Sequence, residues 1–331
     1  MNISVLGAGR WAAALSLHLS RLGHRVLIFA RKDSIASEIN RGFHPYLGLS
    51  LPKEIRASAD IREVLEFSEV ILVCLPVQSI REVISNLDLG KRIVISASKG
   101  IEIKTGLRVS EIVKEIAPKA HFMTLSGPSF AKEVAEGLPC AVVLAGDDRD
   151  LLESSREIFL SPQMRVYLST DLAGVELGGS LKNVVAIACG LSDGLGFGEN
   201  ARASLITRGL LEMIRLGELF GAKRETFFGL SGLGDLILTS CSFLSRNYAL
   251  GFLVGSGKSV EDALMEISQT VEGFYTVKAI NELSKRAGLY TPIFRAVYKV
   301  LYEGFDPLET ALELIYEPPQ SIFEIPHRES I

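Results

Sequence analysis

The pattern of apolar and polar positions changes near residue 169. Before it, short apolar runs alternate with helical patterns, which is typical of an α/β fold built on a mostly parallel sheet. After it, strand signals stop and helical periodicity dominates. We therefore predict two domains, a doubly wound sheet domain over residues 1–168 and an all-α domain over residues 169–331.

The first predicted strand–helix–strand unit carries a glycine motif. An apolar run at 2–6 leads into Gly7 and Gly9, a helical pattern spans 10–21, and a second apolar run follows at 24–30. In this order Gly7 permits the tight turn, Gly9 lets the backbone approach a pyrophosphate, and the helix N-terminus faces the phosphates. The sheet domain is therefore predicted to be of the Rossmann type. A glycine-rich turn in another α/β fold is the minor alternative.

The residues after the second predicted strand indicate which nicotinamide cofactor is used. An NAD-dependent enzyme usually has an acid there that binds the ribose hydroxyls. This chain has Arg31 and Lys32, and Asp33 comes slightly too late for that role. Two cations pair well with a 2′-phosphate, so we predict NADPH in preference to NADH. A solvated pair of loop cations remains the alternative.

Further apolar runs extend the predicted sheet. They lie at 69–77, 92–100, the start of 121–137, 141–146 and 164–169. Lys99 lies just beyond a buried strand, at the sheet edge where ligands bind in open parallel sheets. Gly127 and Ser129 follow the next strand and precede a helix that begins near Phe130 or Ala131. A surface lysine is the alternative interpretation of Lys99.

One long apolar helix, predicted over 171–193, opens the second half. It is apolar on almost every side, so it must be buried. Lys182 has no acid three or four positions away, so it either extends to solvent or faces a site. Gly178 and Gly179 each cost about 1 kcal/mol in a helix interior, which indicates close approach of another group, cofactor or substrate. We predict that Lys182 faces a catalytic cleft; a well-packed core helix is the alternative.

Farther along, two polar positions are candidates for a binding site. Asp235 follows a glycine turn and is surrounded by apolar residues. Ser245 is a predicted helix N-cap, and Arg246 beside the helix N–H groups would bind a phosphate or carboxylate. A capped surface helix with a solvated arginine fits the spacing equally well. Gly194, Gly196 and Gly198 are interpreted as a loop before a helix at about 201–220, because no strand precedes them.

Composition and charge narrow the class of protein. The chain has 331 residues, 22% of them charged, and a net charge of −4, which argues against a general nucleic-acid partner. No charge-free run reaches about 18 residues, and the N-terminus lacks the basic-then-apolar order of a signal peptide. The four cysteines are widely scattered. We expect a cytoplasmic protein with no membrane span, no nucleic-acid partner and no metal, and a loose tail after about Tyr316.

Seven motifs together resemble bacterial NAD(P)-dependent glycerol-3-phosphate dehydrogenase. They are GAGRWA at 7–12, SKG at 98–100, SGPSFAKE at 126–133, the block from LGGSLKN to ITRG at 177–209, GLGDLILT at 232–239, SRN at 245–247 and VEG at 271–273. The resemblance covers nearly the whole chain in the family's order. It implies reversible interconversion of dihydroxyacetone phosphate and sn-glycerol 3-phosphate, and a cytoplasmic role in phospholipid precursor supply. We also expect a homodimer.

The resemblance also implies residue roles. It makes Lys182 the catalytic lysine, with a polar cluster completed by Lys99, Asp235 and Asn183. The expected substrate-binding residues are Lys99, Gly127, Ser129, Lys182, Asp235, Ser245, Arg246 and Asn247. The expected cofactor-binding residues are Gly7, Gly9, Arg10, Trp11, Arg31, Lys99, Ala131, Arg246, Thr270 and Glu272. Arg10 stands where many relatives have serine and Ser129 where threonine is common, and Arg10 could add a second cation near the cofactor phosphates.

The chemistry of ketone reduction is compatible with a lysine acid. Hydride transfer needs a proton donor at the developing alkoxide, and none of the five histidines is a candidate. Desolvation and neighbouring Lys99 would lower the pKa of Lys182 from about 10.4, while Asp235 would hold it charged and oriented. Two alternatives remain: a β-hydroxyacid or 6-phosphogluconate-type dehydrogenase, and a non-catalytic nucleotide sensor.

Overall fold

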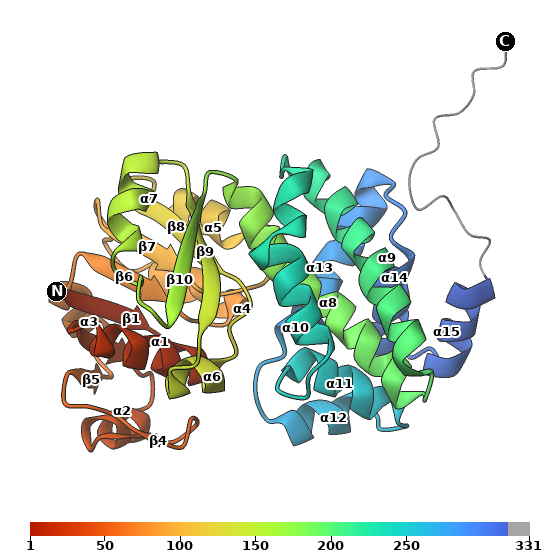
Figure 1. The fold of residues 1–331 in the computed structure, drawn as a ribbon, viewed down its shortest axis with the longest axis horizontal. Helices are drawn as coiled ribbons and strands as arrows, with labels where there is room; N and C mark the ends of the chain where they lie inside the picture. Colours follow the sequence, from red (N-terminus) through yellow and green to blue (C-terminus); the bar gives the residue numbers. More distant parts are fainter. Residues whose placement is uncertain (317–331) are drawn as a thin grey trace, which may run out of the picture.

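The computed structural model describes residues 1–316, and its N-terminal part is built on an eight-stranded sheet (Figure 1). The strands are β1 (Asn2–Leu6), β2 (Arg25–Phe29), β5 (Ile55–Ser58), β6 (Val70–Val73), β7 (Ile93–Ser96), β8 (His121–Ser126), β9 (Cys140–Gly146) and β10 (Met164–Ser169). Their order is β10-β9-β8-β7-β6-β1-β2-β5, and neighbours are parallel except β8 and β9. The predicted Rossmann-type, mostly parallel sheet is therefore confirmed.

Helices cover both faces of this sheet. They are α1 (Arg10–Arg21), α2 (Asp33–Asn40), α3 (Ile61–Phe67), α4 (Val77–Ile84), α5 (Val109–Ile116), α6 (Ala131–Glu136) and α7 (Arg149–Arg156). A short hairpin, β3 (Phe43–His44) and β4 (Leu49–Ser50), follows α2. The sequence of β6 is continuously apolar because both faces of the strand are buried. Val70 and Leu72 belong to the core on one face of the sheet, whereas Ile71 and Val73 belong to the core on the other face.

Helices make up the described part of the chain after β10. They are α8 (Leu172–Gly194), α9 (Gly198–Leu219), α10 (Asp235–Ser240), α11 (Arg246–Gly255), α12 (Val260–Ile267), α13 (Glu272–Ala287), α14 (Pro292–Tyr302) and α15 (Pro307–Tyr316). A 3-10 turn (Arg224–Phe228) and a π-helical turn (Leu230–Gly234) precede α10. This agrees with the predicted all-α second part. The predicted limits 1–168 and 169–331 remain a prediction, and the tail after Tyr316 lies outside the described residues.

Helix α8 is the centre of the helical part (Figure 1). By length and composition it could cross a membrane, but 89% of its most apolar window is buried inside the protein. It is therefore a core helix, and no other helix among the described residues passes that test. The predicted glycine loop after it was too long. Gly194 ends α8 and Gly198 begins α9, so the connection is only Leu195, Gly196 and Phe197.

The glycines at the end of α8 serve helix packing. A Cβ at Gly190 would collide with the Tyr248 carbonyl oxygen of α11, and a Cβ at Gly251 of α11 would collide with the Ile187 carbonyl oxygen of α8. Gly194 and Gly255 repeat this arrangement one turn along. The two helices therefore touch backbone to backbone, which no larger residue permits.

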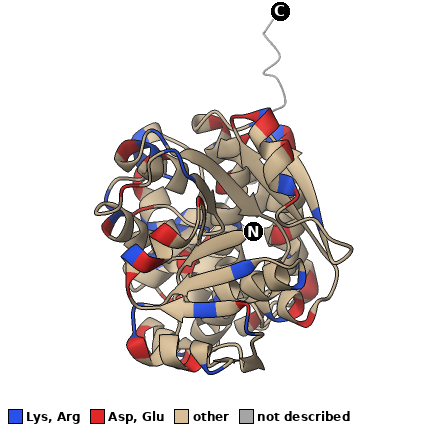
Figure 2. Ribbon diagram, turned by 90° about the vertical axis from the view of Figure 1, so that its left-hand side faces the viewer, with Lys and Arg blue, Asp and Glu red and all other residues tan. Residues whose placement is uncertain are grey.

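Viewed from the sheet end, basic and acidic residues are interspersed on the surface (Figure 2).

Candidate active site

A buried carboxylate binds two lysines where the sheet part meets the helical part. Asp235, at the start of α10, accepts a hydrogen bond from Lys182 Nζ of α8 on Oδ1 at 2.9 Å. Its Oδ2 accepts one from Lys99 Nζ, in the loop after β7, at 2.6 Å. Lys99 Nζ also donates to the Gly127 carbonyl oxygen at 3.2 Å. Three segments far apart in sequence thus place their charged groups around one carboxylate.

Burial and neighbouring charges set the acidity of this cluster. Lys182 is 6% exposed and Asp235 1% exposed, so of the two possibilities that the sequence left open, Lys182 does not extend to solvent. Desolvation lowers the pKa of Lys182 to about 8; Asp235 opposes this effect, whereas Lys99 and Arg246 add to it. Burial alone would raise the pKa of Asp235, but the two lysines outweigh burial and lower it. Asp235 is therefore ionised, and Lys182 can exchange a proton near neutral pH.

Thr239 completes the environment of Lys182 and was not predicted from the sequence. Its Oγ1 accepts a hydrogen bond from Lys182 Nζ at 2.6 Å. Thr239 lies one turn after Asp235 on α10, so its position on the same helix face was the signal available. Lys182 therefore has two fixed acceptors, which orient its ammonium group.

Glycines allow these segments to approach α8, as predicted, but the approaching groups are protein groups rather than cofactor or substrate. A Cβ at Gly179 would lie 2.5 Å from Ser126 Oγ and 3.5 Å from Lys99 Cγ. A Cβ at Gly178 would lie 2.8 Å from the Ser231 carbonyl oxygen, in the π-helical turn before Asp235. That π-helical turn replaces the predicted glycine turn. Both glycines therefore bring the partners of Lys182 within reach.

Two asparagines of the predicted site hold helices together. Asn247 Nδ2 donates to Asn183 Oδ1 at 2.9 Å, and Asn247 Oδ1 accepts from the backbone N–H of Gly273 at 2.9 Å. Asn183 Nδ2 donates to the Gly179 carbonyl oxygen at 3.4 Å. Both side chains are buried. This chain of bonds joins α8, α11 and α13, and a substrate-binding role for either residue stays a prediction.

The predicted anion clamp begins α11. Ser245 is the N-cap, and its Oγ accepts a hydrogen bond from the Tyr248 backbone N–H at 3.2 Å, as predicted. The Arg246 side chain is open to solvent, while dense protein around it lowers its pKa. Glu272 opposes that shift and Arg10 adds to it. Charges from the dinucleotide motif, α11 and α13 therefore act on one another.

Gly127 and Ser129 shape the loop after β8. Ser129 Oγ donates to the Gly127 carbonyl oxygen at 2.9 Å. Gly127 has φ +146°, and a Cβ there would lie 2.9 Å from the Ala141 carbonyl oxygen. The loop therefore needs glycine at this position. Because Lys99 donates to the same carbonyl oxygen, the loop also borders the lysine cluster.

The dinucleotide motif has the geometry that a pyrophosphate requires. Gly7 has φ +113°, and a Cβ there would lie 2.6 Å from the Cys74 carbonyl oxygen. The space around Gly9, the N-cap of α1, is open, so the helix N–H groups are accessible to phosphates. Arg10 Nε donates to the Tyr46 carbonyl oxygen at 2.8 Å. Arg31, after β2, is exposed.

Two buried polar atoms of the predicted cofactor-binding residues have no hydrogen-bond partner among the described residues. Glu272 Oε1 accepts from the Val77 backbone N–H at 3.3 Å, while its Oε2 is buried without a partner among the described residues. Trp11 Nε1 is likewise buried without a partner there. Burial raises the pKa of Glu272 to about 7. Unpaired buried polar atoms are costly, so these residues fit a nicotinamide dinucleotide. Ala131 begins α6 and Thr270 lies just before α13.

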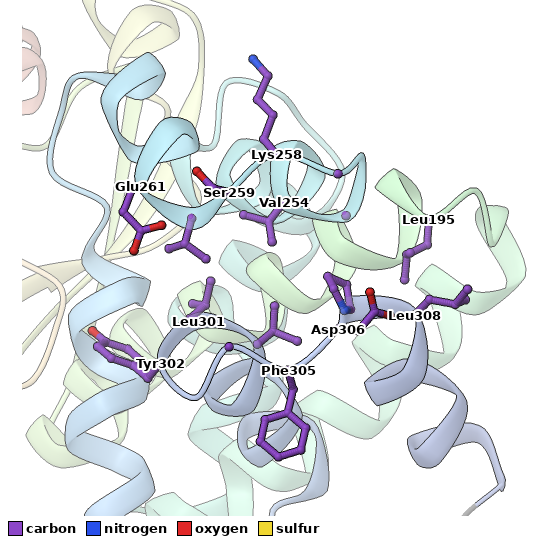
Figure 3. Close-up of a pocket in the computed structure, with 16 residues that line it drawn as sticks. Leu195, Val254, Lys258, Ser259, Glu261, Leu301, Tyr302, Phe305, Asp306 and Leu308 are labelled. Carbon is purple, nitrogen blue, oxygen red and sulfur yellow. The ribbon is translucent and has the colours of Figure 1, made fainter.

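A separate hollow lies at the far end of α8 (Figure 3). It has a volume of about 500 Å³, and its lining includes Leu195, Lys258, Tyr302 and Asp306. Leu195 is about 20 Å along the helix from Lys182, at about 1.5 Å rise per residue. None of the predicted site residues lines this hollow. The candidate active site is therefore the lysine cluster with the adjoining dinucleotide motif.

A dinucleotide-binding sheet with a buried lysine–carboxylate cluster beyond its strand ends defines a nicotinamide-dependent dehydrogenase. Two family models match the chain: NAD-dependent glycerol-3-phosphate dehydrogenase N-terminus over residues 2–152 and C-terminus over residues 171–312. The chain therefore belongs to the NAD-dependent glycerol-3-phosphate dehydrogenase family.

Individual relatives agree over almost their whole length. The chain is 46% identical over 326 residues to glycerol-3-phosphate dehydrogenase [NAD(P)+] of Nitratidesulfovibrio vulgaris (strain DP4), covering 95% of this chain and 98% of the relative. It is 42% identical over 320 residues to the protein of that name from Thermoanaerobacter sp. (strain X514), covering 95% and 97%. The crystal structure of glycerol-3-phosphate dehydrogenase from Coxiella burnetii matches with a TM-score of 0.91 at 37% identity, covering 95% and 98%.

Proposed function

We propose that the protein reversibly reduces dihydroxyacetone phosphate to sn-glycerol 3-phosphate with NAD(P)H and so supplies glycerophospholipid synthesis. The observation that carries the proposal is the buried Lys182, held by Asp235 beside Lys99. A nicotinamide held at the dinucleotide motif would supply the hydride for the carbonyl carbon. Lys182 donates the proton that the carbonyl oxygen then needs, and takes it back in the reverse direction.

The neighbours of Lys182 serve this proton transfer. Asp235 and Thr239 orient the ammonium group. Lys99 contributes a second positive charge near the developing alkoxide, which stabilises that charge in a site with little water. Asn183 aligns α8 with α11 through Asn247. General acid catalysis of this kind contributes roughly 10²- to 10⁴-fold to the rate.

The substrate phosphate binds at the start of α11. Arg246 is accessible there, beside the N–H groups of the helix that Ser245 caps. Asn247, Gly127 and Ser129 border the remainder of the substrate. Binding energy at the phosphate positions the carbonyl against Lys182, which is how a remote group assists the chemical step.

The motif that begins with Gly7 and Gly9 would hold the cofactor's pyrophosphate. Arg31 pairs with the 2′-phosphate, so NADPH is preferred over NADH. Glu272 offers its free carboxylate oxygen to an N–H donor of the nicotinamide amide. The remaining cofactor contacts come from Arg10, Trp11, Lys99, Ala131, Arg246 and Thr270.

A substrate panel tests this function against its alternatives. Purified protein is mixed with NADPH or NADH and either dihydroxyacetone phosphate, a β-ketoacid or no substrate, and cofactor absorbance is followed. We expect turnover with dihydroxyacetone phosphate. Turnover of the ketoacid alone would identify a hydroxyacid dehydrogenase, and cofactor binding without turnover would identify a nucleotide sensor. A homodimer and a cytoplasmic location are also proposed; light scattering and cell fractionation test them.

A further inference from the structure

Helix α8 carries a buried acid, Glu176, which the proposed reaction does not use. Its side chain is 4% exposed. Glu176 Oε1 accepts from the Ser110 backbone N–H at 2.8 Å. Its Oε2 accepts from Ser110 Oγ at 2.5 Å and from Arg108 Nη1 at 2.9 Å. Ser110 lies in the first turn of α5, which belongs to the sheet part, so these bonds join α8 to the other half of the molecule.

The Arg108 bond ends on the loop that carries Lys99, and Ser110 lies two residues beyond that loop. This loop, residues 97–108, runs from β7 to α5 with Lys99 near one end and Arg108 at the other. It touches α8 at two further points. Ser180 Oγ donates to the Gly100 carbonyl oxygen at 3.2 Å, and the Lys99 stem lies against Gly179. All contacts fall within about one turn of α8, directly before Lys182.

The opposite side of the loop is fixed to α4. Gln78 Nε2 donates to the Ile101 carbonyl oxygen at 2.8 Å, and Gln78 Oε1 accepts from the Ile103 backbone N–H at 3.0 Å. Arg81 forms an ion pair with Glu102 at 2.9 Å. The loop is therefore held to the sheet part and does not follow α8 by itself.

The lysine cluster is divided between the two halves of the molecule. Lys182 and Asp235 lie on α8 and α10, which pack in the same helical core. Lys99 comes from the sheet part. The distance between Lys99 and Asp235 consequently depends on how α8 is seated against the loop, and charge-assisted hydrogen bonds such as those of Glu176 are short and directional.

We propose that Glu176 and Arg108 are positioning residues, which seat the Lys99 loop on α8 so that Lys99 meets the pair of Lys182 and Asp235. The inference rests on the proposed role of Lys182. If the contact is lost, Lys99 moves away from both groups. The pKa of Lys182 then rises, because the repulsion by Lys99 weakens and Asp235 is no longer shared.

The test measures kcat and KM for dihydroxyacetone phosphate reduction against pH in Glu176→Gln and Arg108→Lys. The second variant keeps the charge but cannot bridge Glu176 and Glu111 as Arg108 does. In both variants we expect kcat to fall at least about threefold and KM for NADPH to stay constant. The alkaline limb of the kcat–pH profile, where kcat declines as pH rises, should move to higher pH. A role in stability alone would lower the melting temperature and leave that limb in place.

Glu212→Gln is the matched control. Glu212 is also a buried acid that accepts two backbone N–H bonds at the start of a helix, from Ile293 at 2.9 Å and Phe294 at 3.1 Å. Both of its helices, α9 and α14, lie within the helical part, so the limb should stay at the wild-type pH. An unchanged limb with near-normal kcat in both Glu176→Gln and Arg108→Lys would overturn the inference. Full activity of Lys182→Ala would instead overturn the proposed function beneath it.

Discussion

At the scale of residues, the site depends on one carboxylate shared by two lysines. Burial disfavours the charged form of Lys182, and the attraction of Asp235 opposes that effect. Two unit charges about 3 Å apart attract by about 6 kcal/mol at an effective dielectric constant of about 20. For the proposed proton transfer, this attraction keeps Lys182 protonated, while Lys99 and burial lower its pKa so that the proton can be released.

The acidity of Lys182 predicts opposite pH profiles for the two directions. Its pKa is lowered to about 8, so the protonated form required for ketone reduction is lost as pH rises through that value. The neutral form required for alcohol oxidation appears over the same range. We expect kcat for reduction to fall and kcat for oxidation to rise with a common midpoint. Initial rates at saturating substrate from pH 6 to 10 measure both, and parallel profiles would contradict the assignment.

The cations after β2 give a second prediction. Replacing Arg31 and Lys32 together with alanine should raise KM for NADPH about tenfold or more, since a charge-assisted hydrogen bond contributes roughly 1.5–3 kcal/mol. KM for NADH should change less than about twofold. Lys53 is an exposed cation in the same part of the chain, and Lys53→Ala is the control. Equal effects on the two cofactors would show that these cations do not bind the 2′-phosphate.

At the scale of elements, α8 was well predicted because its apolar positions cover every side. Its glycines correctly indicated close approach of other groups. The identity of those groups could not be predicted, because the contacts come from α11, the loop after β7 and the π-helical turn, all distant in sequence. Thr239 was missed for a related reason: a hydroxyl one turn from an acid is common, and only the tertiary fold directs Lys182 toward it.

Backbone contact between α8 and α11 predicts that Gly251→Ala destabilises the protein. By helix propensity alone, alanine should stabilise an interior helical position by about 1 kcal/mol. The added Cβ would instead collide with the Ile187 carbonyl oxygen, and overpacking typically costs about 1–3 kcal/mol. We expect a net loss in the free energy of unfolding, measured by urea denaturation. A gain would mean that the helices can separate without cost.

At the scale of the whole molecule, the proposed catalysis depends on joining two halves that the sequence pattern already separates. The change from alternating to helical patterning predicted the fold class, and β10 ends at Ser169 before α8 begins at Leu172. The predicted lysine cluster forms in the structure as Lys99, Lys182 and Asp235. The contact between Arg108 and Glu176 was not predicted, because the two residues are 68 residues apart and neither lies in a recognisable motif.

The rate of Lys182→Ala decides whether Lys182 donates the proton. NADPH absorbance is followed with saturating dihydroxyacetone phosphate, and NADPH binding is checked separately by fluorescence. We predict a loss in kcat of at least about 10²-fold, the lower range for general acid catalysis, with NADPH affinity retained. A loss below about tenfold, or roughly 1.4 kcal/mol of barrier, would contradict Lys182 as the proton donor.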